Sequence, residues 1–419
     1  MAKRAVRVTA VAASAQLGGT ERVLLDFANR AFEHDLNLRV LTPRDGPLIG
    51  ILNEIGVPAQ VVPAGERMLA GSQRAGHLWS LPGSVAGLVT WARQLNRHEF
   101  FRDADAIYTV AFKAHLAAAW LRRHPVVWHL HEYPPATTGP GWRVLSRYLP
   151  DAIIANSEAT ARAWGKPATT VVPNGVDLDR FRPRPRTYWI HEKLGLPREH
   201  RIIGMPAVFA RWKGQLEAIQ AFSVVGSQVS DVHLVFVGGS IYDTVAERAY
   251  ALELERAVGA AGERVHLLLF QPKIELVYPE FDLVLHYSLR PEPFGRVILE
   301  AMASGVPVIA AGEGGPIEIL GERDVANGPQ VTNRPPDRPS ARPPDRLTAR
   351  PPVRPVGWLA PPRDVPALAQ TMRDALSLPP EQLNGMGEAA RRRAEDHFSS
   401  RQFAKRVADV LRGVVLETP

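Results

Sequence analysis

One stretch of the chain, residues 286–320, gathers residue types suited to a charged, hydroxyl-rich ligand. Its sequence is HYSLRPEPFGRVILEAMASGVPVIAAGEGGPIEIL. Pro293 blocks helix formation before Phe294, and an apolar stripe then continues to Gly305, so the pattern predicts a helix that begins near Phe294 and Gly295. Amides in the first turn of a helix lack partners and attract anions. We therefore expect an anion site at this helix start.

Two carboxylates flank the predicted anion site. Glu292 lies just before the helix and Glu300 lies inside it, so both can edge one wall of a cleft. A carboxylate accepts hydrogen bonds on both oxygens, which suits paired sugar hydroxyls. A glycine pair, Gly314 and Gly315, precedes another short predicted helix at Pro316 and repeats the anion-site geometry. Each feature alone is typical of an ordinary surface, and only their combined order points to a binding site.

Alternating strands and helices must position these residues. In the first half, strands are predicted in the order RVTAVAAS, LRVLTP, AQVVP, DAIYTV, PVVWHL, DAIIANS and TTVVPNG. A helix is predicted over residues 20–33, where Val23, Phe27 and Ala31 recur on one face. The pattern restarts near Arg201 with the strands RIIGMPAV, VHLVFVGG, VHLLLF, DLVLHYS and VPVIAA. This alternation predicts two doubly wound, Rossmann-like α/β halves with a cleft between them.

The composition excludes several kinds of site. The chain has 419 residues and no cysteine, so disulfides, thiolate nucleophiles and Cys-ligated metal centres are impossible, and a reducing cytosol fits best. No run of residues reaches the ~18 to 20 apolar positions that span a bilayer. The apolar run from Ala10 to Ala15 is too short for a signal peptide. The net charge is +7, but the basic residues are scattered without a nucleic-acid-binding signature, so we expect no nucleic-acid partner.

Residues 334–357 differ from the rest of the chain. They form three tandem octads, RPPDRPSA, RPPDRLTA and RPPVRPVG, which are rich in proline and arginine. Proline removes backbone donors and favours extended geometry, so we predict a surface insertion without a packed core. An inert expanded repeat and a proline-motif ligand are the two readings of this insertion.

The order of the motifs resembles the family 4 retaining glycosyltransferases of the GT-B fold, also described as glycosyl transferases group 1. PEPFGRVILEAMASGVPVIA is similar to the family signature, a proline-flanked Glu, then Phe-Gly, then Glu-Ala after seven intervening residues. Four further stretches resemble, in turn, the first glycine-rich loop, the histidine loop, the end of the first domain and the basic loop that opens the second: GGTERVLLDFA, VVWHLHEYPP, VVPNGVDLDRF and RWKGQLEAIQAF. The resemblance covers most of the chain.

The resemblance implies donor-binding roles in the second half. Glu292 would contact hydroxyls of the donor sugar, and Glu300 would hold the ribose of the nucleotide. The amides of Phe294 and Gly295 would lie beside the sugar diphosphate. Lys213 would neutralise the charge of that diphosphate.

The resemblance also implies roles in the first half. Gly18 and Gly19 would let the first loop approach the phosphate or the acceptor closely. His131 would face the reacting sugar from the opposite domain, although a histidine after an apolar strand is often simply buried. Further polar contacts on the acceptor or sugar side are expected from Lys113, His115 and His129.

One departure concerns the charge at the diphosphate. The family has a Gly-Arg pair six and five positions before its lysine, where this chain has Ala207 and Val208. The expected diphosphate arginine is therefore missing. Arg211, two residues before Lys213, could supply that charge along a different backbone path. The Arg/Pro repeat is a second departure, because the family has a short connection there.

The resemblance implies a GT-B architecture of two Rossmann-like domains facing a central cleft. We predict an N-terminal acceptor-side domain over residues 1–180 and a C-terminal nucleotide-sugar-binding domain over 181–398. A C-terminal helix over 399–419 is expected to cross back to the first domain. The implied enzyme is a metal-independent hexosyltransferase-type glycosyltransferase without a cofactor. It would move a sugar from a nucleotide-diphosphate donor to an acceptor hydroxyl with retention, in cell-surface polysaccharide or lipid-linked glycan synthesis.

Other functions stay open at this point. A nucleotide-sugar epimerase of the same shape needs similar contacts, and a degenerate, non-catalytic sugar-nucleotide-binding protein would explain Val208. Asp177 and Asp179 could suggest an Asp-x-Asp metal site, but they lie at the junction of the two halves. We expect a cytoplasmic protein. The basic excess in residues 1–180 is either an ordinary solvated surface or a peripheral contact with the anionic inner face of the cell membrane.

Deletion of Arg334 to Pro355 is expected to leave the melting temperature nearly unchanged. A solvated proline-rich insertion buries little apolar surface, and loop-closure entropy changes by only about 0.6 kcal/mol per doubling of loop length. Differential scanning calorimetry of the deletion variant measures this. Unfolding of the variant, or loss of its turnover, would show that the repeat is integral to the structure.

Overall fold

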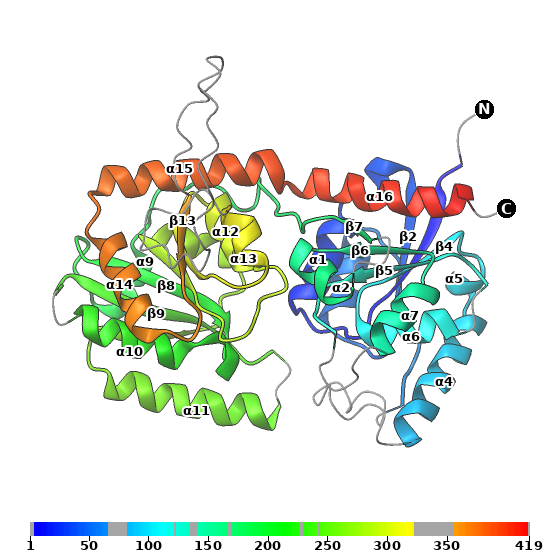
Figure 1. The fold of residues 1–419 in the computed structure, drawn as a ribbon, viewed down its shortest axis with the longest axis horizontal. Helices are drawn as coiled ribbons and strands as arrows, with labels where there is room; N and C mark the ends of the chain where they lie inside the picture. Colours follow the sequence, from blue (N-terminus) through cyan, green and yellow to red (C-terminus); the bar gives the residue numbers. More distant parts are fainter. Residues whose placement is uncertain are drawn as a thin grey trace, which may run out of the picture.

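The computed structural model describes residues 4–65, 82–120, 123–134, 141–165, 169–226, 229–241, 244–321 and 356–417. The chain forms two lobes, each built on one parallel sheet with helices on both faces (Figure 1). The predicted architecture of two Rossmann-like α/β domains is confirmed.

The N-terminal sheet has the strand order β3-β2-β1-β4-β5-β6-β7. Its strands are β1 (Val6–Val11), β2 (Leu36–Thr42), β3 (Ala59–Val61), β4 (Ala106–Thr109), β5 (Val126–Leu130), β6 (Ala152–Ala155) and β7 (Thr169–Val171). The accompanying helices are α1 (Gly19–Ala28), α2 (Pro47–Glu54), α4 (Pro82–Arg97), α5 (Glu99–Arg102), α6 (Phe112–Trp120), α7 (Gly141–Tyr148) and α8 (Glu158–Ala163). Every residue of β4 and β5 is buried, as expected for central strands of a parallel sheet that is covered on both faces.

The first helix is shorter than its apolar periodicity predicts. α1 ends at Ala28, and Ala31–His34 form a separate 3₁₀ turn. Asp35 then adopts a left-handed conformation with φ of 54°, which turns the chain directly into β2. The prediction of one helix through residue 33 is therefore wrong, because the buried Ala31 belongs to the turn and not to the helix.

The C-terminal sheet has the strand order β10-β9-β8-β11-β12-β13. Its strands are β8 (Arg201–Val208), β9 (Val232–Gly239), β10 (Val265–Leu269), β11 (Leu283–His286), β12 (Val308–Ala311) and β13 (Gly357–Ala360). The helices are α9 (Trp189–Leu194), α10 (Gln215–Gly226), α11 (Val245–Ala260), α12 (Arg296–Ala303), α13 (Gly315–Leu320), α14 (Val365–Leu376), α15 (Pro380–His397) and α16 (Ser400–Glu417), with 3₁₀ turns at Arg211–Lys213, Ile274–Leu276 and Tyr278–Glu280.

Most of the Arg/Pro repeat lies outside the described residues. Its last two positions do not, and they correct the predicted boundary at residue 357. Val356 is buried, and Gly357 pairs with Val308 as the first residue of β13. Gly357 therefore belongs to the edge strand β13, and Val356 packs in the core just before it.

The chain crosses between the lobes twice, and the two crossings touch. Val176 donates to the carbonyl of Phe398 at 2.8 Å and accepts from the amide of Ser400 at 2.9 Å. Beyond this point α16 lies along the N-terminal lobe, end to end with α15 (Figure 1). Phe403 and Leu411 of α16 are buried in the same apolar cluster as strands β1 and β2. The last helix therefore completes the core of the first lobe.

A membrane span is not found in the part of the chain that the structure describes. None of its helices combines the length and the apolar character needed to cross a bilayer.

The Gly175→Ala variant is expected to lose about 1–3 kcal/mol of unfolding free energy, the usual cost of overpacking. A Cβ at Gly175 would lie 2.6 Å from the Cα of Ser400 and 2.8 Å from the Cβ of Phe403, where the two crossings pack. Gly50→Ala in α2 is the matched control, because a Cβ there meets nothing within 4 Å. Urea unfolding should show the control unchanged or stabilised by up to ~1 kcal/mol. Equal stability of the two variants would contradict tight packing at the crossings.

Candidate functional site

Glu292 is the centre of a polar cluster between the lobes. Its side chain is only 14% exposed, and its Oε2 lies 2.9 Å from the Nζ of Lys213. The same oxygen accepts from the Oγ of Ser288 at 2.7 Å and lies 3.5 Å from the Nε2 of His286. Burial alone would raise the pKa of Glu292, but attraction to Lys213 and His286 and the two hydrogen bonds outweigh it and lower that pKa to about 2. The carboxylate is therefore ionised near neutral pH.

A glycine allows Lys213 to reach this cluster. Lys213 ends a 3₁₀ turn after β8, and Gly214 follows with φ of 74°. A Cβ at Gly214 would lie 2.2 Å from the carbonyl oxygen of Tyr287, so only glycine lets this loop lie against the end of β11. The amide of Leu289 donates to the carbonyl of Trp212 at 2.7 Å and joins the two loops.

The glycine pair holds the backbone of Glu292 from the other side. Gly314 bridges to Glu292, and the amide of Gly315 donates to the Glu292 carbonyl at 2.8 Å. A Cβ at Gly314 would lie 2.3 Å from that carbonyl oxygen. The glycine pair was predicted to repeat the anion-site geometry, and this needs correction because the Gly315 amide is already used within the protein.

The predicted helix start is present. Gly295 caps α12 with φ of 116°, and Arg296 is the first helical residue. The Phe294 side chain is buried in the apolar core of the C-terminal lobe, so only its backbone remains for a ligand. The structure brings Glu292 to Lys213, and Phe294 and Gly295 follow Glu292 at the start of α12.

Glu300 lies in the same helix, with partners on both carboxylate oxygens. The hydroxyl of Tyr278 donates to Oε2 at 2.7 Å, and the Nη2 of Arg296 lies 3.6 Å from Oε1. Arg296 also reaches across the cleft to Asp26 of α1 at 2.6 Å. A ribose hydroxyl would therefore share Glu300 with Tyr278 and Arg296.

His129 lies in β5 and His131 directly follows that strand, and the two histidines differ in their surroundings. The His129 Nδ1 is hydrogen-bonded to the hydroxyl of Tyr108 inside the lobe. His131 packs against His129 with ring centroids 4.0 Å apart, and its Nε2 has no hydrogen-bond partner among the described residues. Burial, followed by the charge of Arg296, lowers the pKa of His131 to about 3. His131 is therefore a neutral imidazole, and the positive charge of Arg296 in the opposite lobe contributes to keeping it neutral.

His115 was expected to make a contact on the acceptor or sugar side, but its side chain is buried inside the N-terminal lobe. Its ring stacks on Trp128 at 5.0 Å, and its Nδ1 is hydrogen-bonded to the Oγ1 of Thr109 at 2.6 Å. Lys113 is also buried, and burial together with the charge of Arg44 lowers its pKa to about 8, against the opposing effect of Glu132. These surroundings make His115 part of the core, because helix α6 turns it toward the sheet.

Arg211 and the first glycine loop are not part of the Glu292 cluster. Arg211 points to Glu217 at 3.7 Å and Glu253 at 3.6 Å, on α10 and α11, and the structure does not bring it to Lys213's partner Glu292. Gly18 caps α1, and a Cβ at Gly19 would meet nothing within 4 Å, so the space beside this loop is open.

Sequence reasoning missed a buried acid beside the first loop. Glu21 lies in the first turn of α1, where burial is the main cause that raises its pKa to about 7, and nearby Glu132 adds to the effect. The Oε2 of Glu21 is buried and has no hydrogen-bond partner among the residues that the structure describes. The sequence offers one indication of this acid, because Glu21 lies two residues after the pair Gly18-Gly19.

A metal site is not indicated by the side chains that the structure describes. These residues bring no group of three His, Asp or Glu together in a way that could hold an ion. The Oδ1 of Asp177 accepts from the amides of Asp179 and Arg180, so the Asp-x-Asp sequence forms a turn.

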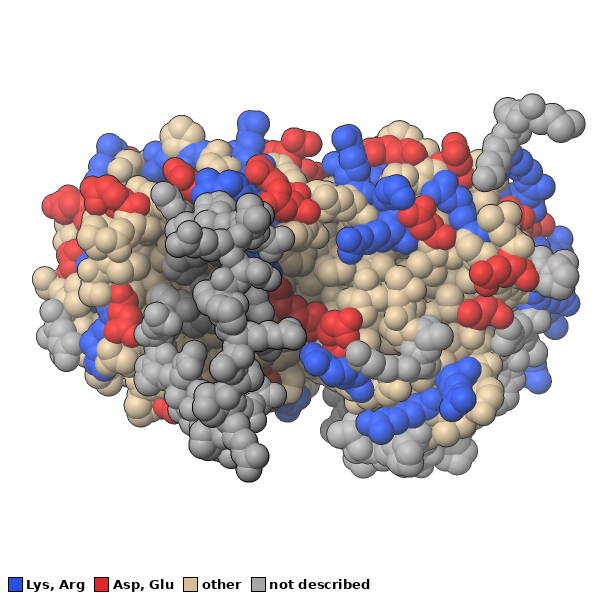
Figure 2. Space-filling view, turned by 45° about the horizontal axis from the view of Figure 1, so that its top comes forward, with Lys and Arg blue, Asp and Glu red and all other residues tan. Residues whose placement is uncertain are grey.

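A cavity of about 450 Å³ opens between the lobes at the Glu292 backbone. The N-terminal lobe contributes Tyr133, Pro134, Ala159, Arg162 and Ala163, and the C-terminal lobe contributes Pro291 and Gly314. Figure 2 shows acidic side chains gathered at the junction of the lobes with basic side chains beside them. This cavity adjoins the cluster and is the candidate ligand site.

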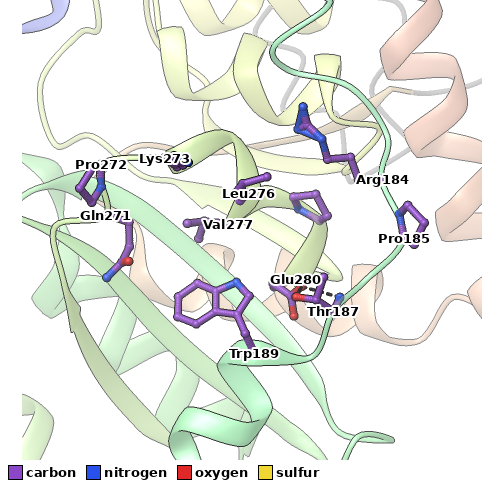
Figure 3. A pocket seen from close by; sticks show the side chains of 11 residues that line it. Arg184, Pro185, Thr187, Trp189, Gln271, Pro272, Lys273, Leu276, Val277 and Glu280 are labelled. Carbon is purple, nitrogen blue, oxygen red and sulfur yellow. Dashed lines mark hydrogen bonds between the residues drawn. The ribbon is translucent and has the colours of Figure 1, made fainter.

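A second cavity of about 490 Å³ lies apart from the cluster. Trp189 and Glu280 line it, and Thr187 donates to Glu280 from its amide and its hydroxyl at 2.8 Å each (Figure 3). None of its lining residues contacts Glu292 or neighbours it in the chain. The smaller cavity is lined by Pro291, which precedes Glu292, and by Gly314, which bridges to it, so we take the smaller cavity as the candidate site.

Comparisons with known proteins agree with this geometry. The profile "Glycosyltransferase Family 4" matches residues 17–180, and "Glycosyl transferases group 1" matches residues 189–337. A D-inositol 3-phosphate glycosyltransferase of Xylanimonas cellulosilytica is 27% identical over 69% of this chain and 73% of its own length. One from Mycolicibacterium gilvum is 34% identical over 40% of this chain, but the match spans only 36% of that relative. The crystal structure of Anabaena HepE in complex with UDP and glucose is 25% identical, with a TM-score of 0.73 over 97% of this chain and 99% of HepE.

The stability difference between the wild type and Glu292→Gln is expected to shrink as the pH falls. The pKa of Glu292 is lowered from 4.5 to about 2, so its ionic contacts stabilise the fold above pH 4.5 and are lost as the pH approaches 2. The contribution is about 3 kcal/mol, at 1.36 kcal/mol per pKa unit. Chemical unfolding of both proteins from pH 7 to pH 3 measures the difference. A constant difference would show that Glu292 is not held as a buried ion pair.

Proposed function

Because the chain belongs to the family 4 glycosyltransferases of the GT-B fold, we propose that it transfers a sugar from a nucleotide-diphosphate donor to an acceptor hydroxyl with retention of configuration. The observation that carries this proposal is the ionised Glu292, held by Lys213 beside the start of α12 and next to the cavity between the lobes. That arrangement offers an acceptor for sugar hydroxyls and a cation for phosphate in one place.

The relatives support a nucleotide sugar as the donor. Anabaena HepE has been crystallised with UDP and glucose and with UDP-glucose, and its likeness covers nearly the whole of both chains. We take a UDP-sugar as the first donor to test. The curated relatives named above are matched over 36% and 73% of their lengths, so their inositol phosphate acceptor is not transferred to this chain.

The donor would lie with its sugar on Glu292 and its diphosphate between Lys213 and the first amides of α12. Glu300 would accept from the ribose hydroxyls, next to its contacts with Tyr278 and Arg296. Lys213 and the helix start stabilise the negative charge that develops on the leaving group.

The proposed reaction needs no protein nucleophile. The bond between the sugar carbon and the β-phosphate oxygen breaks, and the acceptor oxygen bonds to that carbon on the same face. The departing phosphate oxygen takes the acceptor proton. His131, neutral and without a hydrogen-bond partner on Nε2 among the described residues, would face the sugar from the other lobe.

The acceptor is proposed to be a glycan or a lipid-linked glycan. The basic excess in residues 1–180 supports work at an anionic membrane surface. Thermal-shift measurements with UDP-, GDP- and ADP-sugars test the donor, because only a ligand preferred by the folded protein raises its melting temperature.

A degenerate binding protein is the second candidate, and two observations favour it. Val208 replaces the family arginine, and Arg211 is engaged by Glu217 and Glu253. Lys213 is then the cation that this loop brings to the cluster. If the wild type transfers no sugar from any donor while Val208→Arg gains activity, the degenerate protein is the better description.

Lys213→Ala is expected to lower turnover roughly a hundredfold or more, the scale of losing one preorganised electrostatic contact. Arg211→Ala is the matched control from the same turn. A change of less than about threefold is expected, because the Arg211 side chain is 57% exposed and its long ion pairs with Glu217 and Glu253 point away from Glu292. Transfer assays with product detection, alongside melting curves to confirm folding, measure both. A large loss in Arg211→Ala would show that Arg211 moves to the diphosphate when the donor binds.

A further inference from the structure

The N-terminal lobe grips the backbone at the start of the donor-binding loop. The hydroxyl of Tyr133 donates to the carbonyl of Glu292 at 3.3 Å. The hydroxyls of Ser157 and Thr160 donate to the carbonyl of Pro293 at 2.7 and 3.3 Å. All three donors come from one lobe and both acceptors from the other, so these bonds exist only while the lobes are together.

A second set of hydrogen bonds runs in the opposite direction between the lobes, with a carboxylate of the C-terminal lobe as the acceptor. Glu318 of α13 accepts from the amides of Glu158 and Ala159, the first two residues of α8, at 2.8 Å each. Both carboxylate oxygens are used, and a negative charge at a helix N-terminus is favourable. The contact is therefore bidentate and charge-assisted, the kind that fixes geometry.

The two sets of contacts are coupled through short elements. Ser157 is the N-cap of α8, so the helix start that Glu318 binds also carries a donor to Pro293. Gly315, the first residue of α13, donates to the Glu292 carbonyl at 2.8 Å. Glu318 is thus connected to the Glu292 backbone in two ways. One runs along α13 through Gly315, and the other runs through the start of α8 and Ser157.

We propose that Glu318 is a positioning residue: by binding the start of α8 it holds the lobes at the separation at which Tyr133, Ser157 and Thr160 fix the backbone of Glu292 and Pro293. The Glu292 carboxylate follows its backbone, so the grip sets where that carboxylate meets the donor sugar, a contact that rests on the proposed function. The ion pair between Arg296 and Asp26 joins the lobes independently. Loss of Glu318 is therefore expected to make the lobe separation larger and more variable, while the Arg296–Asp26 pair keeps the lobes in contact.

The absence of cysteine makes the lobe separation measurable. Arg97→Cys in α4 and Arg256→Cys in α11 place one spin label at an exposed position on each lobe. Figure 1 shows that α4 and α11 belong to different lobes. Glu318→Gln keeps the shape but turns an NH₂ group toward an amide N–H, so it loses the bidentate contact. Glu388→Gln is the matched control, because that glutamate lies on α15 and, within the described part of the chain, its ion pair is an exposed one with Arg392 of the same helix.

Glu318→Gln is expected to give longer and broader inter-label distances than the wild type, and Glu388→Gln the same distances as the wild type. Equal distributions in all three proteins would overturn the proposal. This measurement needs no turnover, so it decides the grip even if no donor is found and the proposed function fails.

Kinetics test the consequence for transfer. With UDP-glucose as donor, Glu318→Gln should lower kcat about tenfold, since small misplacements of a contacting group lower rates strongly. The affinity for UDP, measured by calorimetry, should stay within about threefold, because the grip acts on the loop at the sugar. Tyr133→Phe, which removes only a hydroxyl, should shift kcat in the same direction. Unchanged kcat in both variants, with an active wild type, would overturn the positioning role.

Discussion

The pairing of the largely buried side chains of Glu292 and Lys213 constrains the loops around it. An isolated buried carboxylate costs several kcal/mol, so it must be met by a cation and by hydrogen bonds. Lys213 and Ser288 supply these from different loops, with Nζ and Oγ at 2.9 and 2.7 Å. Each loop must approach the other closely, which explains why Gly214 and Gly314 stand where a Cβ would strike a carbonyl oxygen. The ion pair and the two glycines form one unit.

This unit belongs to the C-terminal lobe, but its surroundings come from both lobes. Tyr133 and Ser157 hold the backbone at Glu292 and Pro293, and Asp26 pairs with Arg296 in the first turn of α12. The arrangement of the side chains around a donor bound between the lobes would therefore depend on the relative position of the two lobes. The neutral imidazole of His131, influenced by Arg296 of the opposite lobe, is another example of this dependence.

The sequence predicts the strands better than it predicts side-chain partners. Periodicity locates β8 within its observed bounds, because a buried parallel strand is a continuous apolar run. The motif order leads to Lys213 and Glu292, and they do meet. It cannot show that Arg211 turns to Glu217 and Glu253, since two helices distant from the motif decide that. The burial of His115 could not be predicted for a similar reason, because its stacking on Trp128 depends on how α6 lies on the sheet. The roles of the predicted site residues stay predictions.

The position of α16 has a consequence for the order in which the protein matures on the ribosome. The first lobe shares its apolar cluster with Phe403 and Leu411, which are synthesised long after β7. At ~5–20 residues per second, the chain between Gly175 and Ser400 takes roughly 10–45 s to appear. During that interval the nascent first lobe exposes the apolar groove that α16 later fills. The first lobe can therefore complete its core only after the last helix of the chain has been made.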